Sequence, residues 1–551
     1  MDDASPRKRA PLQSSTTSLS GAWSIVVIGA SGDLAKKKTY PALLKLFAGG
    51  LLPAHCTIVG TARSKYTNEE FRAKLGPYLE KSGLDPDIIA AFTLRLLYQP
   101  CGYTSTEDYT ALSVILDGIE RGFGDEEAHR MFYLAIPPSV FVAASGSIKA
   151  GAMSTRGTTR IVIEKPFGHD LESSEVLRKG LSALFEEEQM YRIDHYLGKE
   201  MVQNLLMMRF ANSIFEPLWS RHHIQTVSIT FKEDIGTQGR GGYFDNIGII
   251  RDVMQNHLMQ IMSIVAMDTP VSLDSEDIRD EKVRVLRCTR PIELEDVVLG
   301  QYTGSEDGAE PGYLDDDSIE NKESNTPTFA QAALWIDNER WSGVPFILKC
   351  GKALNERKAE IRIQFKDKVP SLYKQVYRNE LVMRVQPDMA IYMKTNLKQP
   401  GLSHETTMGE LDMTYSEAFA DAYLPDAYER LILDVLKGHS ENFVRDDELN
   451  VAWKIFTPLL HRIDTEGIQP SKYTFGSRGP TEADRFKARL GYKRSVDCAS
   501  LSPARPSARP LPFASHPRRA LFFRPLLFSP SSPLPPRPLA RNRFVDVKRA
   551  Y

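Results

Sequence analysis

The chain has 551 residues, 42% hydrophobic and 25% charged, and a formal net charge of -2 at pH 7. Such a length and composition are typical of a globular protein with more than one hydrophobic core, and we expect two large domains. The sequence contains no run of about 18 apolar residues, which argues against a membrane-spanning helix. No basic stripe occurs before residue 495, so nothing there indicates nucleic-acid binding.

Cysteine usage indicates a reducing compartment. The five cysteines are odd in number, lie far apart and form no CxxC pair, which argues against a disulfide framework and against a metal site. Residues 1–21 carry acids before a basic cluster and lack the apolar stretch of a secretory signal. We therefore expect a disordered leader and a cytoplasmic protein.

Residues 22–195 alternate between apolar runs and helix-like segments. The first run, WSIVVIGA at residues 23–30, is short and rich in β-branched residues, as buried parallel strands are. A glycine turn and a helix-like stretch follow it. Further strand-like runs begin at residues 56, 132 and 160. This alternation predicts an α/β domain with a Rossmann-like, doubly wound parallel sheet.

Residues 196–494 have a different pattern. Longer strand-like runs between irregular loops predict a larger α+β domain with a mostly antiparallel sheet covered by helices. The expected strands lie near residues 222–233, 296–304, 329–338, 359–367 and 380–387. The expected helices lie near residues 201–212, 251–265 and 427–438. Residues 495–551 are rich in Pro, Arg and Ser without periodicity, and we expect them to be disordered.

A glycine-containing turn follows the first strand. Its glycines let backbone amides approach a pyrophosphate at the next helix N-terminus, although the GxxGxxA spacing also fits a purely structural turn. The second strand ends without the acid that holds an NAD ribose. It offers Arg63 for a 2′-phosphate, which favours NADP, although Arg63 also fits a solvated loop charge. The turn consists of Gly29, Ala30, Ser31, Gly32, Asp33, Leu34 and Ala35.

Two charged segments follow strands of the first domain. In RIDHYLGKE, His195 and Lys199 would share a helix face and could clamp a dianionic phosphate; an exposed helix start is the alternative. Lys165 comes directly after a strand, at the edge where open α/β sheets bind ligands. Its alternative is an ordinary surface lysine.

His257 lies within an otherwise apolar helix-like segment. Such a histidine is either a hydrogen-bonded core residue or a general base. Asp252 is five residues away, about 140° around an α-helix, and is therefore a poor orienting partner. A base at this position needs a carboxylate from another segment.

With these segments in view, the chain resembles the glucose-6-phosphate dehydrogenases of the eukaryotic, cytosolic type, in unbroken order from about residue 23 to about residue 494. The resemblance implies oxidation of D-glucose 6-phosphate to 6-phospho-D-glucono-1,5-lactone with reduction of NADP, the first step of the oxidative pentose phosphate pathway. Its markers are GASGDLAKKK, EKPFG, RIDHYLGKE, FKEDIGTQGRGGYFDNIGIIRDVMQNH, RDEKVRVL, VPFILKCGKALNERKAEIRIQF, LPDAYERL and GSRGPTEAD.

The resemblance also implies a role for each site residue. His257 would take the proton of the C1 hydroxyl as hydride leaves for the nicotinamide, and Asp194 would orient it. Lys38 and Lys165 would lie between cofactor and substrate, with a cis peptide bond before Pro166. The 6-phosphate would be held by His195, Tyr196 and Lys199. The rest of the substrate pocket would be Lys165, Glu233, Asp252, Lys352, Arg357 and Gln386.

Relatives from higher organisms bind a second, non-catalytic NADP in the sheet domain. The matching positions are Lys349, Lys358, Arg362, Arg384, Tyr392, Lys394, Asp412, Thr414 and Arg478. Lys349 stands where many relatives have Arg, which keeps the charge but not the bidentate geometry. The aromatic terminal segment of the family is missing after Arg494. We interpret residues 495–551 as the translation of an unspliced or frame-shifted stretch.

The likeness further implies a homodimer or homotetramer joined through the sheet domain. Two other functions stay open at this point. One is a catalytically weak, NADP-binding regulatory protein, and the other is a dehydrogenase of the same two-domain plan that acts on an unphosphorylated sugar. Formation of NADPH from glucose 6-phosphate tests the first, and replacement of Lys199 tests the second.

Overall fold

The structure is a computed structural model that describes residues 19–494 except 368–371, 374–375 and 420. The expectations for residues 1–18 and 495–551 lie outside the described residues. Within the described ranges, no helix is both long and apolar enough to cross a membrane.

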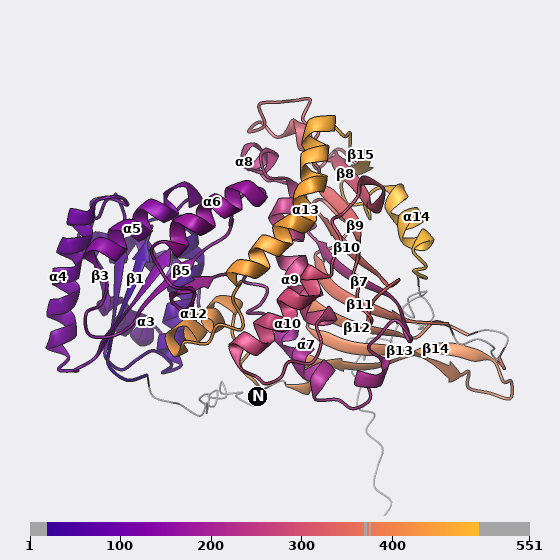
Figure 1. Ribbon diagram of the computed structural model, residues 1–551, viewed down its shortest axis with the longest axis horizontal. Helices are drawn as coiled ribbons and strands as arrows, with labels where there is room; N and C mark the ends of the chain where they lie inside the picture. Colours follow the sequence, from indigo (N-terminus) through magenta and orange to yellow (C-terminus); the bar gives the residue numbers. More distant parts are fainter. Residues whose placement is uncertain (1–18, 368–371, 374–375, 420, 495–551) are drawn as a thin grey trace, which may run out of the picture. The chain divides into compact units, whose positions relative to one another are not determined.

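The N-terminal domain contains a six-stranded sheet in which every neighbouring pair is parallel (Figure 1). The strand order is β3-β2-β1-β4-β5-β6. The strands are β1 (Ala22–Ile28), β2 (Cys56–Thr61), β3 (Leu96–Tyr98), β4 (Ala128–Leu134), β5 (Thr159–Ile163) and β6 (Met190–Arg192). This confirms the parallel sheet that the alternating apolar runs predict.

Helices cover both faces of this sheet, because consecutive side chains of a strand point to opposite faces. In β1, Trp23, Ile25 and Val27 pack in one core with α1, α2 and α3, whereas Val26 and Ile28 pack in another with α4, α5 and α6. The helices are η1 (Ala35–Thr39), α1 (Tyr40–Ala48), α2 (Asn68–Glu80), α3 (Pro86–Leu94), α4 (Thr106–Gly122), η2 (Pro138–Val140), α5 (Phe141–Gly151), α6 (Leu171–Ser182) and η3 (Glu187–Gln189).

The C-terminal domain contains a nine-stranded sheet of order β14-β13-β12-β11-β7-β10-β9-β8-β15. Its pairs are antiparallel except β7 with β10 and β8 with β15. The strands are β7 (Ile224–Lys232), β8 (Val297–Thr303), β9 (Phe329–Trp335), β10 (Pro345–Gly351), β11 (Lys358–Phe365), β12 (Glu380–Gln386), β13 (Ala390–Lys398), β14 (Thr406–Thr414) and β15 (Ser471–Thr474). The predicted fold class, α/β followed by α+β, is confirmed.

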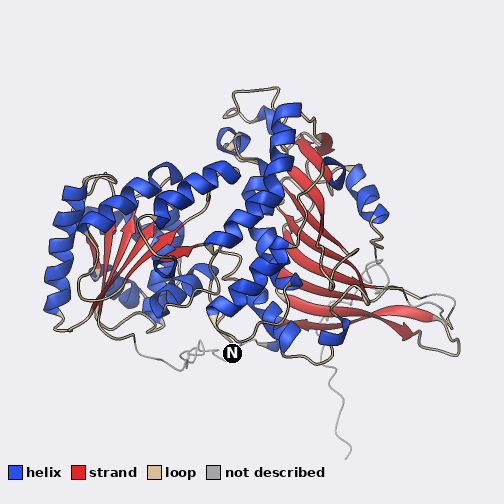
Figure 2. Cartoon of the chain, in the orientation of Figure 1, coloured by secondary structure: helices blue, strands red, loops and turns tan. Residues whose placement is uncertain are grey.

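Most helices of this domain lie along one face of the large sheet (Figure 2). Every residue of α9 is buried, as expected for a helix that is apolar on all sides and enclosed by other elements. The helices are α7 (Glu200–Phe210), η4 (Glu216–Leu218), α8 (Gly241–Asp245), η5 (Ile250–Leu258), α9 (Met259–Ala266), α10 (Ser275–Arg287), η6 (Leu294–Asp296), η7 (Tyr313–Asp315), α11 (Tyr415–Ala418), α13 (Asp446–Glu466) and α14 (Thr481–Arg489).

One helix of the C-terminal half, α12 (Ala427–Lys437), packs on the N-terminal domain. Its apolar side chains, including Leu431 and Val435, belong to the same core as α1. Arg160 of β5 donates hydrogen bonds to the carbonyl oxygens of Val435 (2.5 Å) and Leu436 (2.8 Å), at the helix end where the dipole favours a cation. The chain therefore returns to the first domain after it has built most of the second.

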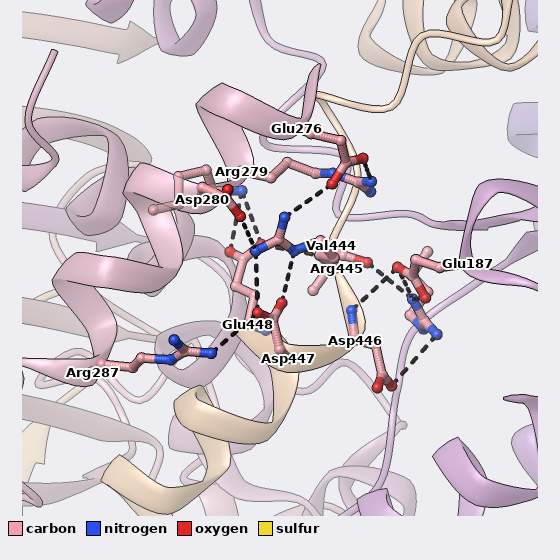
Figure 3. A network of polar contacts seen from close by, with 12 residues as sticks. Glu187, Glu276, Arg279, Asp280, Arg287, Val444, Arg445, Asp446, Asp447 and Glu448 are labelled. Atoms are coloured by element: carbon pink, nitrogen blue, oxygen red, sulfur yellow. Dashed lines mark hydrogen bonds and ion pairs between the residues drawn. The ribbon is translucent and has the colours of Figure 1, made fainter. Parts of the chain in front are cut away.

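A network of ion pairs joins the end of β6 to the start of α13 (Figure 3). Arg192 pairs with Glu187 at 2.8 Å and with Asp446 at 3.7 Å. Next to it, Arg445 pairs with carboxylates of α10 and α13. These contacts hold the segment that leads from the parallel sheet into the second domain.

Candidate active site

An aspartate and a histidine from the two domains meet in a buried hydrogen bond. Asp194 follows β6 of the parallel sheet, and His257 lies on η5 of the second domain. Nδ1 of His257 lies 2.5 Å from Oδ1 of Asp194, and the backbone N–H of Tyr196 donates to the same oxygen (2.9 Å). Both carboxylate and imidazole are 3% exposed. A carboxylate in this position favours the tautomer with the proton on Nδ1.

The electrostatics of this pair favour an ionised carboxylate and a neutral imidazole. Burial alone would raise the pKa of Asp194, but His257, His195 and the Tyr196 amide together hold that pKa well below its usual value. Burial lowers the pKa of His257, although the charge of Asp194 opposes this. A neutral imidazole of this tautomer has a lone pair on Nε2 and can accept a proton there.

Lys165 lies at the other nitrogen of the same ring. Its ammonium is 3.0 Å from Nε2 of His257 and donates to the backbone carbonyl of Asp252 at 2.8 Å. The Asp252 carboxylate is 3.5 Å away. The peptide bond between Lys165 and Pro166 is cis, as the resemblance implies. A lysine from the domain that carries the glycine turn therefore faces the histidine of the other domain.

The helix around His257 differs from the α-helix assumed for it. Residues 250–258 wind as a π-helix, in which hydrogen bonds join residues five apart. Asp252 and His257 both contact Lys165, so the angular separation predicted for them is wrong. The carboxylate that orients the imidazole still comes from a different segment, because Asp194 occupies Nδ1.

The polar string after Asp194 is also not helical. Residues 195–198 form turns, and α7 begins at Glu200 with Lys199 as its N-cap. The prediction that His195 and Lys199 share a helix face is therefore wrong. Turns are favoured here because the carboxylate and the carbonyl of Asp194 accept hydrogen bonds from backbone N–H groups two and three residues on.

The side chains of this string nevertheless gather around the imidazole. The rings of His195 and Tyr196 both have their centres 4.6 Å from that of His257. The ammonium of Lys199 lies over the Tyr196 ring at 4.8 Å and donates to Oε1 of Gln386 (2.7 Å). Burial lowers the pKa of Lys199, and the positive charges of Arg357 and Lys38 add to this effect. A concentration of cationic side chains like this suits an anion.

A lysine bridges two carboxylates beside this cluster. Lys352 lies 2.6 Å from Glu233 and 3.8 Å from Asp252. Glu233 and Lys352 directly follow β7 and β10, which are parallel neighbours, so their ends meet at one edge of the sheet. Burial alone would lower the pKa of Lys352, but the two carboxylates raise it and keep the ammonium charged. Such alternating donors and acceptors suit sugar hydroxyls.

The glycine turn of the first domain has a backbone that only glycine adopts without strain. Gly29 has a φ of 84°, and a Cβ atom there would lie 2.2 Å from the carbonyl oxygen of Ala135. The Gly32 N–H donates to the Gly29 carbonyl (2.8 Å), and the chain then enters η1. Arg63, just beyond β2, is exposed, and its guanidinium lies 5.2 Å from the ring centre of Tyr103.

The residues implied as a second nucleotide site lie on the adjacent strands β11–β14, on β10 beyond β7, and just before α14. Arg362 of β11 donates to the hydroxyl of Tyr392 on β13 (3.3 Å), and Asp412 of β14 is opposite Tyr392 in the register. Lys349 donates to the carbonyl oxygen of Arg478 (2.9 Å), and burial lowers its pKa to about 7. The other members are Lys358 on β11, Arg384 on β12, Lys394 on β13 and Thr414 on β14.

Sequence reasoning missed two buried side chains next to assigned site residues, Glu164 beside Lys165 and Tyr428 beside His195. The Tyr133 hydroxyl donates to Glu164 (2.5 Å), and burial raises the pKa of this carboxyl to about 7. Tyr428 of α12 lies parallel to the His195 ring, with 6.0 Å between centres. Glu164 occurs within the segment EKPFG and Tyr428 within LPDAYERL, but nothing in their residue type predicts their partners.

A parallel sheet with a glycine turn, joined to a domain that supplies a buried histidine beside a lysine, defines a nicotinamide-dependent dehydrogenase. Comparison with protein families identifies the kind. The glucose-6-phosphate dehydrogenase NAD binding domain matches residues 26–204, and the glucose-6-phosphate dehydrogenase C-terminal domain matches residues 206–494. The chain belongs to the glucose-6-phosphate dehydrogenase family.

Similar proteins agree over nearly their whole length. The glucose-6-phosphate 1-dehydrogenase of Dictyostelium discoideum is 52% identical over 475 residues, 86% of this chain and 95% of that protein. The one from Saccharomyces cerevisiae is 51% identical over 472 residues, 85% of this chain and 93% of that protein. A solved glucose-6-phosphate dehydrogenase in complex with its substrate glucose 6-phosphate is 47% identical, with a TM-score of 0.84 over 87% of this chain and 100% of that chain.

These likenesses establish the reaction class. The chain is an oxidoreductase that oxidises D-glucose 6-phosphate to 6-phospho-D-glucono-1,5-lactone with a nicotinamide cofactor. This reaction is the first step of the oxidative pentose phosphate pathway.

Proposed function

We propose that the cofactor is NADP and that His257 is the catalytic base. The observation that carries the proposal is the 2.5 Å hydrogen bond between Asp194 and His257, which leaves Nε2 as the proton acceptor. The bound nicotinamide supplies the acceptor for the hydride that leaves C1. Nε2 takes the proton of the C1 hydroxyl, and Asp194 stabilises the resulting imidazolium.

The substrate is held at two ends in this proposal. His195, Tyr196 and Lys199 bind the 6-phosphate, with Arg357 and Gln386 closing that end. Lys165, Glu233, Asp252 and Lys352 contact the sugar hydroxyls. The ion pairs of Lys352 with Glu233 and Asp252 support this assignment, because they orient donors and acceptors before the sugar arrives.

The coenzyme lies on the first domain in this proposal. Backbone amides of the glycine turn, residues 29–35, hold the pyrophosphate at the start of η1, and Lys38 and Lys165 flank it. Arg63 binds the 2′-phosphate, because no acid stands at the end of β2 to prefer a free ribose hydroxyl.

A second NADP is proposed for the row of cations and hydroxyls on β11–β14, together with Lys349 on β10 and its neighbour Arg478. Lys349 supports this, since a buried lysine whose pKa is about 7 gains most from a nearby phosphate, which would raise that pKa. We further propose a homodimer or homotetramer joined through the sheet domain and a cytoplasmic location. Two similar proteins of Arabidopsis thaliana are named as cytoplasmic.

The reaction is tested by the absorbance of the reduced cofactor, with glucose 6-phosphate and either NADP or NAD. We expect a higher kcat/KM with NADP. Equal kcat/KM values would remove the specificity assigned to Arg63. A folded protein without turnover would favour the regulatory alternative.

The phosphate role is tested by Lys199→Ala. We expect KM for glucose 6-phosphate to rise by about 10- to 100-fold, because one hydrogen-bonded charge contact is worth about 1.5–3 kcal/mol. The KM for free glucose should change little. Lys179→Ala, at an exposed lysine of α6, is the matched control and should leave both KM values unchanged. Equal changes for both sugars in Lys199→Ala would favour an unphosphorylated substrate.

A further inference from the structure

Three side chains at the catalytic pair have the composition of a transition-metal site. Asp194, His195 and His257 each offer one ligand atom, and these atoms all lie within 4.8 Å of one another. Imidazole nitrogen and carboxylate oxygen are common zinc ligands, and zinc sites that keep an open position use three protein ligands. In a tetrahedral site with bonds of about 2.0–2.2 Å, the ligand atoms stand about 3.5 Å apart. Small side-chain movements therefore suffice to close the trio on an ion.

Two of the three ligands have unused lone pairs. Oδ2 of Asp194 is buried and has no hydrogen-bond partner among the described residues, although its sister oxygen accepts two hydrogen bonds. The His195 ring packs against the rings of Tyr196, His257 and Tyr428, and no hydrogen bond of its nitrogens occurs in the described part of the chain. A buried acceptor without a partner costs free energy that a bound cation would recover.

We propose that Asp194, His195 and His257 form an inhibitory site for Zn²⁺. The inference rests on the proposed function, because the same side chains serve as base, orienting carboxylate and phosphate ligand. The ion takes Oδ2 of Asp194, one nitrogen of His195 and Nδ1 of His257, with water as the fourth ligand. The imidazole proton moves from Nδ1 to Nε2, so no proton is gained or lost. A ring protonated on Nε2 can no longer act as the base.

Lys165 is the neighbour that this rearrangement must accommodate. Its ammonium faces Nε2 at 3.0 Å, and an N–H there would repel it. The same ammonium already donates to the carbonyl oxygen of Asp252 at 2.8 Å and lies 3.5 Å from the Asp252 carboxylate. It therefore has other acceptors when Nε2 gains a proton. Its charge and that of Lys199, which both act on His195, weaken metal binding.

Metal binding is measured on the full-length, untagged protein without substrate. Equilibrium dialysis with Zn²⁺ should give one ion whose affinity falls by at least about 100-fold in His195→Gln and in His257→Gln, more than the loss of an outer-shell partner costs. Co²⁺ in place of Zn²⁺ should show the visible absorption of a four-coordinate site. Circular dichroism and coenzyme binding check that both variants are folded.

The control is a second trio of the same kind on the surface. Asp170, Glu172 and His461 also place ligand atoms within 4.8 Å, but His461 and Glu172 are exposed. His461→Gln should leave the affinity of the inhibitory ion unchanged. Equal affinity in wild type, His195→Gln and His257→Gln, or loss of the ion in His461→Gln, would overturn the proposal.

Competition separates this inference from the proposed function. Glucose 6-phosphate should displace the ion, and Zn²⁺ should raise the KM for glucose 6-phosphate but not that for NADP. An ion unaffected by saturating glucose 6-phosphate in an enzyme with normal turnover would refute an inhibitory site. Binding that depends on His195 in a protein without turnover would support the metal site and count against the proposed function alone.

Discussion

The imidazole of His257 receives its orienting carboxylate from the other domain, and the charge on that carboxylate decides the basicity of Nε2. The effects on His257 are opposed, since burial lowers its pKa and Asp194 raises it. We therefore expect the acid limb of kcat/KM to lie below the ordinary imidazole value of about 6.5. Below that limb the base is protonated and activity is lost.

Asp194→Asn tests this balance. Without the carboxylate charge, the pKa of His257 falls further, so the acid limb moves to lower pH. The base is also weaker and less well oriented, and kcat should fall by about 10²- to 10⁴-fold. The measurement is kcat/KM from about pH 4, near ordinary carboxyl pKa values, to about pH 9, below the ordinary lysine pKa.

A surface pair provides the control for that variant. His55 and Asp125 form a similar contact of 2.7 Å, but the histidine is half exposed. Asp125→Asn should leave kcat and the profile unchanged. An acid limb that stays in place or moves upward in Asp194→Asn would contradict the role of the carboxylate.

Glu164 is a buried acid next to Lys165 whose pKa is raised from 4.5 to about 7 by burial. Between these values the unfolded chain loses a proton that the folded protein keeps, so the stability of the folded protein falls as pH rises from about 4.5 to about 7. Glu164→Gln keeps an acceptor for Tyr133 and removes this dependence. In thermal unfolding, the free energy of unfolding of the variant relative to wild type should increase across that window, by at most about 3 kcal/mol above pH 7. A constant difference at all pH values would contradict a raised pKa.

At the scale of elements, short apolar runs and glycine turns were enough to predict the parallel sheet. Buried strands need β-branched residues on both faces, so β1 is conspicuous in the sequence. The antiparallel class of the large sheet was also predictable. Its strands β10, β13, β14 and β15 were not identified, and the parallel pairing of β10 with β7 depends on chain reversals that no local pattern encodes.

The sequence predicted several of the side chains that gather around His257, but not their geometry. The winding of η5 depends on hydrogen bonds that reach the fifth preceding residue instead of the fourth, and the turns at residues 195–198 depend on hydrogen bonds to Asp194. Residue spacing reveals neither. The partner of Glu164 depends on the pairing of β4 with β5, and that of Tyr428 on how α12 docks. Its apolar periodicity shows that it buries a face, but not which domain receives it.

The junction of β1 and η1 is the element that glycine controls most strictly. Gly29→Ala places a Cβ 2.2 Å from the Ala135 oxygen at a φ of 84°, which costs about 1–3 kcal/mol of strain or moves the turn. We expect KM for the coenzyme to rise at least about 10-fold with little change in KM for the sugar. Gly118→Ala, in the middle of α4 with open space around it, is the matched control and should be neutral or stabilising. Unchanged coenzyme binding in Gly29→Ala would contradict a pyrophosphate site at this turn.

At the scale of the whole molecule, the described residues contain every side chain assigned to the two proposed nucleotide sites and to the sugar site. The match to the family ends at residue 494. Deletion of residues 495–551 should therefore leave kcat and both KM values within about twofold, since substitutions away from a site usually change free energies by under 0.5 kcal/mol. A loss of activity above tenfold, with circular dichroism unchanged, would show that the last segment takes part in the reaction.

The hydrogen bond between Asp194 and His257 joins side chains 63 positions apart, one after β6 of the first domain and one on η5 of the second. Neither half of the polypeptide, folded by itself, contains the hydrogen-bonded pair that we propose as the base. During refolding after dilution from denaturant, the rate at which turnover returns therefore reports the docking of the two domains. The change in far-ultraviolet ellipticity reports the formation of secondary structure within each domain. A substitution that weakens this contact between the domains should give a protein that is folded by spectroscopic criteria but catalytically inactive.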